Sequence, residues 1–380
     1  MENLIRLAAK LLKKGLDVKK VVKQLRDFEG VSVEDAKEAI ELASARFKAK
    51  KKFSKWKEMY FDSDSLRMAS PEVVSKYRAK RLKSKALADL CAGAGGNTIF
   101  FAQESKKVYA VELDSKRLEY AKKNAAAYGI KNVEFIRGDI MDKSVLKKLK
   151  DVEKVFCDPW RPITEKVRDI MKTQPPLPDI LRVYSKITKN IAFEAPVQIT
   201  PERIPLDCEK EYISVDGQLN RLTLYFGSLK RADRSVTILP ADETLLSKSK
   251  VPKLKESDFK KYFYEPDPAV IKANLLPELG DLINASKVKG FDFLTSDKLV
   301  DSPFIKNRFE FLAVTDTDFG NIIDALVENN AGKIVLRATI EPQRFKAMKE
   351  KFELDLVGSK KLHLFLFKDR AVIAQNLAFK

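Results

Sequence analysis

The sequence predicts an α/β fold built on an open, largely parallel sheet. Three short apolar runs, residues 87–91, 108–111 and 133–136, have the length of buried strands. Segments with helical periodicity separate them, and this alternation is typical of β-α-β units. An acid stands at the end of each run, namely Asp89, Glu112 and Asp139. Because the carboxyl ends of parallel strands share one edge of a sheet, we expect these acids to lie on one rim.

A glycine-rich turn after the first strand predicts a ligand site. Gly93, Gly95 and Gly96 follow that strand directly. Glycine permits positive φ and lets a ligand approach the backbone closely. A helix can begin at Asn97 or Thr98, and the amides of its first turn favour an electron-rich ligand.

Glu112 indicates the kind of ligand. A carboxylate at the end of the second strand can accept hydrogen bonds from both hydroxyls of a ribose, so a nucleoside cofactor is expected. A nicotinamide cofactor is disfavoured, because its fingerprint needs a third glycine where this chain has Thr98.

The turn resembles motif I of the class I S-adenosylmethionine-dependent methyltransferases, D-x-G-x-G-x-G, with Cys91 in place of the first glycine. The resemblance implies S-adenosylmethionine as cofactor. It also implies that the glycines shape the pocket for the methionine end, that Glu112 holds the ribose and that Asp139 meets the adenine. The residues expected to bind the cofactor are Asp89, Cys91, Ala92, Gly93, Gly95, Gly96, Asn97, Thr98, Glu112, Leu113, Asp139 and Ile140.

The candidate catalytic residues are Asp158, Pro159 and Trp160, which follow the predicted fourth strand. They resemble the D/N-P-P-Y/F/W motif of methyltransferases that modify exocyclic amines of bases. A carboxylate there can accept the hydrogen bonds of the amine and orient its lone pair, and an aromatic ring can stack on the base. Arg161 is predicted to pair either with an RNA phosphate or with Asp158.

Composition favours a polyanionic partner. The 380 residues include 72 Lys and Arg against 54 Asp and Glu, a formal charge of +18. A solvated, thermophile-like surface is the alternative explanation. Three widely spaced cysteines and a single histidine, His363, disfavour a disulfide framework and a metal site. No apolar run approaches the ~20 residues of a membrane span, so a soluble, cytoplasmic protein is expected.

Residues 1–55 are expected to form a basic helical domain. Its end interleaves lysines with aromatic residues, a composition that suits phosphate contact and base stacking; a charged helix end leading into a linker is equally compatible. The RNA-binding candidates in this region are Lys50, Lys51, Lys52, Lys55, Trp56 and Lys57, with Arg161 in the catalytic domain.

Three further segments complete the predicted organisation. Residues 56–229 are expected to form a Rossmann-like catalytic domain with seven strands, the last of them antiparallel, closed by a hairpin at Asp216-Gly217. Residues 230–261 have little hydrophobic periodicity and suggest a linker or arm. Residues 262–380 alternate strands and helices and predict a small α/β domain.

Taken as a whole, the chain resembles class I methyltransferases that carry a C-terminal THUMP-like domain. The resemblance rests on DLCAGAGGNT, the run from Asp158 to Arg161, EYISVDGQLNRLTLYFG and YFYEPDPAVIKANL. It implies a ferredoxin-like C-terminal fold and an RNA substrate, tRNA or rRNA, with a base amine as the favoured acceptor. Methylation of a ring nitrogen or a protein side chain, and an RNA-binding scaffold without catalysis, are the alternatives. No metal and no obligate protein partner are expected.

Overall fold

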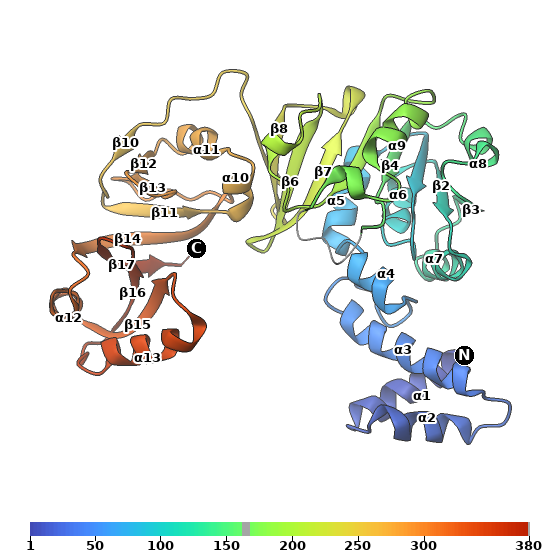
Figure 1. Cartoon of the computed structure of the whole chain (residues 1–380), viewed down its shortest axis with the longest axis horizontal. Helices are drawn as coiled ribbons and strands as arrows, with labels where there is room; N and C mark the ends of the chain where they lie inside the picture. Colours follow the sequence, from blue (N-terminus) through green and yellow to red (C-terminus); the bar gives the residue numbers. More distant parts are fainter. Residues whose placement is uncertain (162–167, 379–380) are drawn as a thin grey trace. The chain divides into compact units, whose positions relative to one another are not determined.

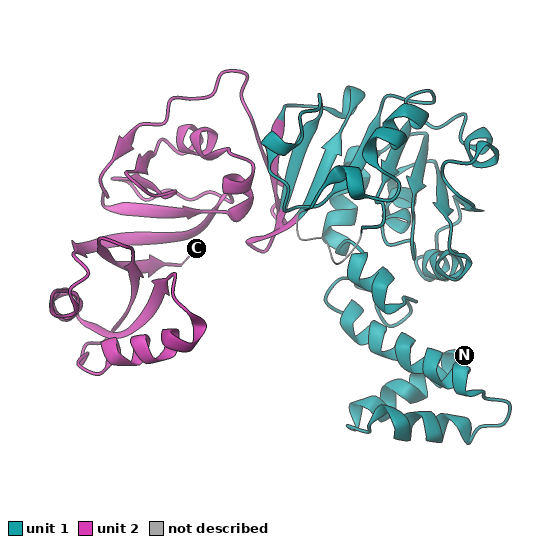
Figure 2. Cartoon of the chain, in the orientation of Figure 1, with its two compact units in different colours: residues 1–213, 221–233 teal, residues 214–220, 234–380 magenta. Residues whose placement is uncertain are grey.

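The computed structural model describes residues 1–161 and 168–378, which form two compact units. Residues 1–213 and 221–233 make the first unit, and residues 214–220 and 234–380 make the second (Figure 2).

The first unit begins with helices that share a core with the catalytic sheet. These are α1 (Glu2–Lys13), α2 (Val18–Arg26), α3 (Val33–Ala49), α4 (Ser63–Met68) and α5 (Glu72–Leu82) (Figure 1). Asp17 and Ser32 cap α2 and α3, as their side chains accept hydrogen bonds from backbone amides. One apolar cluster runs from Ile5 in α1 to Phe156 in the sheet. Buried residues of 1–55 therefore pack in one apolar cluster with residues of the sheet.

The sheet of the first unit has five parallel strands at its centre. They are β1 (Ala86–Leu90), β2 (Lys107–Glu112), β3 (Val133–Arg137), β4 (Lys154–Cys157) and β5 (Ile191–Ala195). The connecting helices are α6 (Thr98–Glu104), α7 (Ser115–Ala127), α8 (Lys143–Lys148) and α9 (Leu177–Tyr184), and η1 (Ile170–Lys172) and η2 (Pro201–Arg203) are short 3₁₀ turns. The predicted strands and their parallel arrangement are present.

The sheet extends beyond the expected seven strands. Strands β6 (Glu209–Val215) and β7 (Gln218–Tyr225) form the predicted hairpin, β7 runs antiparallel to β5, and η3 (Gly227–Leu229) follows. The hydrogen-bonded order is β3-β2-β1-β4-β5-β7-β6-β8-β9. Strands β8 (Arg234–Leu239) and β9 (Glu243–Leu246), whose residues belong to the second unit, come from the segment expected to be a linker. Alternate apolar residues of β8, such as Val236 and Ile238, are buried, so the segment carries strand patterning that its lysine content obscured.

The second unit contains an eight-stranded mixed sheet with the order β10-β12-β13-β11-β14-β17-β16-β15. Its strands are β10 (Glu256–Ser257), β11 (Tyr262–Pro266), β12 (Ser286–Val288), β13 (Leu294–Ser296), β14 (Ile305–Thr315), β15 (Ala331–Ala338), β16 (Lys360–Leu366) and β17 (Ala371–Leu377). Its helices are α10 (Pro268–Lys272), α11 (Leu276–Leu282), α12 (Phe319–Glu328) and α13 (Pro342–Glu353).

This arrangement differs from the ferredoxin-like plan, β-α-β-β-α-β. Strands β11 to β14 follow the first part of the plan, but residues 297–304, between β13 and β14, contain no helix. The last part adds a parallel pair, β15 and β16, joined through α13. The single histidine, His363, lies in β16 against Phe309, with ring centroids 5.1 Å apart. Burial, with Arg337 and Lys361 nearby, lowers the pKa of His363 to about 4, so it is a neutral packing residue at pH 7.

Among the helices of the described residues, none combines the length and the apolar character that crossing a membrane requires.

Candidate functional site

The glycine-rich turn leaves β1 at its carboxyl end with a left-handed backbone. Cys91, Gly93 and Gly95 have φ of +59°, +56° and +79°. The turn is anchored to the neighbouring strand, since the amide of Ala92 donates to the carbonyl of Val111 at 2.9 Å. A Cβ at Gly95 would lie 3.0 Å from the Cβ of Ala121 in α7, so a side chain there would clash with that helix. Gly95 thus serves helix packing.

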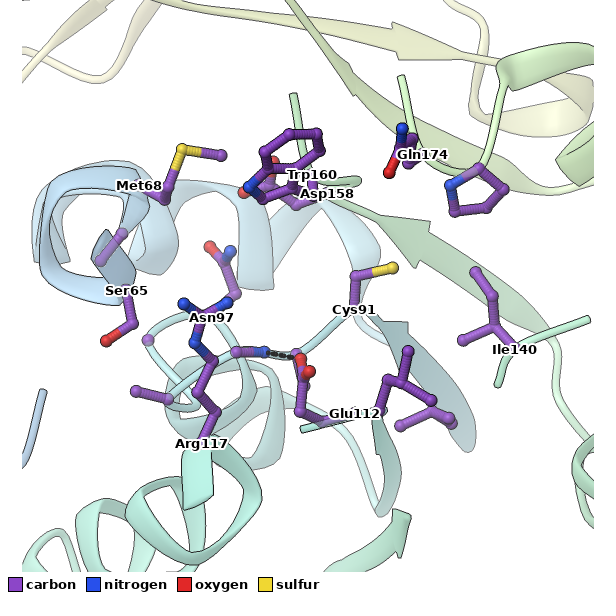
Figure 3. Close-up of a pocket in the computed structure, with 18 of the residues that line it drawn as sticks. Ser65, Met68, Cys91, Asn97, Glu112, Arg117, Ile140, Asp158, Trp160 and Gln174 are labelled. Carbon is purple, nitrogen blue, oxygen red and sulfur yellow. Dashed lines mark hydrogen bonds between the residues drawn. The ribbon is translucent and has the colours of Figure 1, made fainter. Parts of the chain in front are cut away.

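A cavity of about 510 Å³ lies at this rim of the sheet (Figure 3). It brings together most of the residues that the sequence singled out: Cys91, Ala92, Gly93, Gly96, Asn97, Glu112, Leu113, Asp139, Ile140, Asp158 and Trp160. The lining residues that the sequence analysis missed are Phe61, Ser65, Met68, Ala69, Ala94, Val111, Arg117, Gly138, Met141, Gln174 and Pro175.

Glu112 is held at the end of β2 by two backbone amides. Its Oε2 accepts from Gly93 N at 2.7 Å, and its Oε1 accepts from Asp114 N at 2.9 Å. A carboxylate oxygen can accept more than one hydrogen bond, so both oxygens can still accept from a ligand. The glycine turn and the carboxylate therefore fix each other in position.

Asp139 and Ile140, which follow β3, contribute a carboxylate and an apolar surface to the cavity. The side chain of Asp139 is exposed, and its Oδ1 accepts from Met141 N at 2.8 Å. Ile140 is buried, and its carbonyl accepts from the hydroxyl of Tyr184 at 2.6 Å. The apolar face of Ile140 and the exposed Leu113 flank the space next to Glu112.

Four predicted site residues do not line the cavity: Asp89, Gly95, Thr98 and Pro159. Asp89 is 1 % exposed, and its Oδ2 accepts from Thr98 Oγ1 at 2.5 Å, which ties the start of α6 to β1. Burial raises the pKa of Asp89 to about 7, against the opposing effect of the Thr98 hydrogen bond. The structure thus gives Asp89 and Thr98 a supporting position behind the turn.

Asp158 lies at the cavity without a hydrogen-bond donor among the described residues. Its Oδ1 is buried and accepts no hydrogen bond, and it forms an ion pair with Arg161 Nη2 at 3.6 Å. Of the two predicted partners of Arg161, the structure places Asp158 beside it. Trp160 is 44 % exposed, and its backbone carbonyl accepts from Gln174 N at 2.9 Å. A carboxylate paired with Arg161 and an exposed ring thus line the same cavity.

Asn97 is held by a buried ionic network. Its Oδ1 accepts from Ser75 Oγ and from Arg78 Nη1, both at 3.0 Å. Arg78 is fully buried, and its Nη2 lies 2.5 Å from Oε2 of Glu194. The other oxygen of Glu194, Oε1, lies 3.2 Å from Nε of Arg221. Sequence reading missed this network, because its members come from α5, β5 and β7 and share no motif.

Two cationic side chains, Lys52 and Arg221, hold the end of α4, the helix that contributes Ser65 and Met68 to the cavity wall. The Nζ of Lys52 donates to the carbonyls of Leu66, Arg67 and Ala69 at 2.8, 3.2 and 2.7 Å, and Arg221 Nη2 donates to Ala69 O at 3.1 Å. Burial, with Arg221 and Arg67 nearby, lowers the pKa of Lys52 to about 8. Lys52 is therefore engaged by the chain itself, contrary to its predicted contact with phosphate.

The other basic candidates remain at the surface. Lys50, Lys51, Lys55 and Lys57 are exposed, and Trp56 is half-buried against Phe47. Lys55 Nζ donates to Ala127 O at 2.8 Å. Phe53, expected beside them as an exposed aromatic residue, is 2 % exposed, and a Cβ at Gly96 would lie 3.4 Å from its ring.

No cluster of three or more His, Cys, Asp or Glu side chains suited to a metal occurs within residues 1–161 and 168–378.

Comparison with known proteins finds relatives of the parallel-sheet part of the first unit. The family model for RNA cap guanine-N2 methyltransferases matches residues 84–200. An uncharacterized RNA methyltransferase of Clostridium tetani is 40 % identical over 81 residues, which are 21 % of this chain and 17 % of the relative. One of Leptospira interrogans is 29 % identical over 139 residues, 33 % of this chain and 35 % of the relative. The chain thus spans about a sixth to a third of the length of these relatives.

One solved structure resembles the chain over nearly its full length. A candidate methyltransferase from Porphyromonas gingivalis W83 aligns with a TM-score of 0.77 and 16 % identity, covering 99 % of this chain and 98 % of that one. This likeness shows the fold. The family match and the named relatives support an S-adenosylmethionine-dependent methyltransferase domain around residues 84–200.

The residues of the cavity fit S-adenosylmethionine. The cavity volume of about 510 Å³ lies within the roughly 300–1,000 Å³ typical of ligand pockets. Glu112 would hold the ribose, and Asp139, with Leu113 and Ile140, would meet the adenine. The turn around Gly93 would shape the space for the methionine end. The cofactor, when bound, supplies a methyl group on a sulfonium centre.

Proposed function

We propose that this protein methylates an exocyclic amine of a base in RNA, with tRNA or rRNA as the substrate class. The observation that carries the proposal is the carboxylate of Asp158, which lies beside the exposed ring of Trp160 in the cofactor cavity. Its Oδ1 accepts no hydrogen bond from the described residues and has Arg161 Nη2 as an ion-pair partner at 3.6 Å. A carboxylate with hydrogen-bonding capacity left is suited to accept the hydrogens of an amine. The ring offers a stacking surface for the base that carries the amine.

These side chains account for the chemistry of an in-line transfer. Asp158 accepts an amine hydrogen and so turns the nitrogen lone pair toward the methyl group. The N–C bond forms as the S–C bond breaks, the electron pair of the broken bond stays on sulfur, and the resulting ammonium releases a proton to water. The matched family is named for guanine-N2 methylation, which is also a transfer to an exocyclic amine.

RNA binding is assigned to the basic surface of the first unit and to the second unit. Lys50, Lys51 and Lys57 are exposed and form no ion pair with a carboxylate of the described residues, which suits them to contact phosphates, although Lys57 Nζ also lies 5.6 Å from the centre of the Trp56 ring. The second unit is proposed to act as the THUMP-like RNA-binding part. Lys55 is proposed to contribute less, since its ammonium group already binds Ala127 O.

The experiment uses total RNA from a strain that lacks this gene. The RNA is incubated with the purified protein and methyl-labelled S-adenosylmethionine, fractionated by size and digested to nucleosides. Label in one RNA band, on a nucleoside methylated at its amine, is the expected result. A labelled ring nitrogen would reject the proposal in favour of ring-nitrogen methylation. Cofactor binding without label in any RNA would reject it in favour of a protein acceptor or of an RNA-binding scaffold without catalysis.

A further inference from the structure

Asn97 and Asp158 offer complementary hydrogen-bonding groups to one ligand. Both line the cofactor cavity, and Figure 3 shows them on the side of it where Trp160 lies. Among the described residues, Asp158 Oδ1 has no donor. The side-chain oxygen of Asn97 is already used, whereas its Nδ2 has no acceptor in the described part of the chain.

The orientation of the Asn97 amide is determined by its neighbours. Arg78 can only donate hydrogen bonds, so the atom of Asn97 that faces Arg78 Nη1 at 3.0 Å must be the oxygen. Ser75 Oγ, also at 3.0 Å, occupies the second lone pair of that oxygen. Asn97 is only 9 % exposed, so little freedom remains for its side chain to turn. The Nδ2 group is therefore the part of the amide left for a ligand.

The ion-pair network that holds Asn97 buries charged side chains, and removing charges from water costs free energy. Arg78 is fully buried and is neutralised by Glu194, which also lies 3.2 Å from Arg221 Nε. Burying charges in this way seldom adds stability relative to apolar packing. It does fix the direction of a hydrogen bond, and here it fixes the amide of Asn97.

We infer that Asn97 Nδ2 and the Asp158 carboxylate together recognise the edge of the target base, which must present an amine next to an acceptor nitrogen of the ring. Asp158 accepts from the amine, and Asn97 donates to the ring nitrogen. Adenine, cytosine and guanine each carry such an edge, and uracil does not. The inference rests on the proposed function and gives Asn97, predicted to bind the cofactor, a role in choosing the base.

The test measures methyl transfer and cofactor affinity separately for Asn97→Ala. The substrate is a synthetic RNA that carries, in unmethylated form, the base that becomes labelled in total RNA. Loss of one hydrogen bond to a buried group lowers kcat/KM about 10- to 100-fold. Affinity for S-adenosylmethionine, measured by calorimetry, is expected to stay within twofold of wild type. Asn376→Ala, at an exposed asparagine of β17, is the matched control.

A second RNA makes the test independent of any general loss of activity. In this RNA the ring nitrogen next to the target amine is replaced by C–H. The replacement should slow the wild type about 10- to 100-fold and should slow Asn97→Ala no further, because both changes remove the same hydrogen bond.

Additive effects of the two changes, or a fall in cofactor affinity that accounts for the lost transfer, would overturn the inference while leaving the proposed function in place. Absence of methyl transfer by the wild type to any RNA would instead overturn both.

Discussion

The amide of Gly93 donates a 2.7 Å hydrogen bond to Oε2 of Glu112, so the glycine turn after β1 and the acid at the end of β2 form one rigid unit. The carboxylate also accepts from Asp114 N at 2.9 Å. With both oxygens fixed, Glu112 is pre-organised to receive two hydroxyl groups, and little ordering remains to be paid when a ribose binds.

Glu112→Ala should therefore weaken cofactor binding more than the loss of one surface acid would. The variant loses the acceptors for the ribose and leaves Gly93 N without its partner, so the dissociation constant for S-adenosylmethionine should rise about 10- to 100-fold. Titration calorimetry measures it. Glu134→Ala in β3, which removes an exposed carboxylate paired with Lys107, is the control. Unchanged affinity of Glu112→Ala would refute the ribose assignment.

Gly95→Ala should destabilise the first unit more than Gly129→Ala does. Both glycines have positive φ, +79° and +73°, but only Gly95 has a neighbour at the Cβ position, Ala121. Backbone strain costs about 1–2 kcal/mol at either site, and overpacking against α7 adds about 1–3 kcal/mol at Gly95. Urea unfolding monitored by circular dichroism compares the two variants. Equal losses of stability would show that α7 yields to the added methyl group.

Asp89 should make stability fall as pH rises from about 4 to 7. Its pKa is raised by burial to about 7, compared with ~3.9 in an unfolded chain. Within this window the folded chain holds a proton that the unfolded chain has lost, so deprotonation penalises folding, and the full penalty is present above pH 7. Asp89→Asn keeps the shape and an acceptor for Thr98 but has no charge to bury.

The stability difference between Asp89→Asn and wild type, taken from urea midpoints, should therefore favour the variant more at pH 8 than at pH 5. A difference that does not change with pH would mean that Asp89 stays ionised throughout.

Charge reversal at Lys50, Lys51 and Lys57 should lower the affinity for RNA. It should also make that affinity depend less steeply on salt concentration. Each lysine that contacts a phosphate contributes about 0.7–0.9 to the slope of log affinity against log salt concentration. Filter binding at several salt concentrations gives both values. The same triple change at Lys147, Lys148 and Lys150, exposed in and after α8, is the control. An equal effect of the two triple changes would indicate attraction to overall charge without a defined binding surface.

The parts of the fold that follow from local signals could be predicted from the sequence. Apolar runs and the turn at Gly93 and Gly95 gave the strands, their parallel arrangement and the shared rim of Glu112 and Asp139. Strand β8 was missed, because the lysine-rich residues that follow it made the whole segment look like a linker. Its alternating apolar residues, Val236 and Ile238, are buried.

The remainder of the site depends on long-range packing that carries no sequence signal. Ser65 and Met68 reach the cavity only because Lys52 and Arg221 hold the end of α4. The roles of Lys52 and Phe53 could not be read from composition, since burial, not residue type, decides whether a lysine or an aromatic ring is free to meet RNA. Asn97 was found from the motif, but its direction is set by Arg78, 19 positions away.

The most direct test of methyl transfer to a base amine compares wild type with Asp158→Asn on the same RNA, using S-adenosylmethionine with an isotopically heavy methyl group. The products are digested and identified by mass spectrometry. We expect the wild type to yield a nucleoside with the heavy methyl group on its exocyclic amine. Asp158→Asn should bind the cofactor normally and transfer the methyl group about 10²- to 10⁴-fold more slowly. A heavy methyl group on a ring atom, or equal rates for the two proteins, would contradict the account.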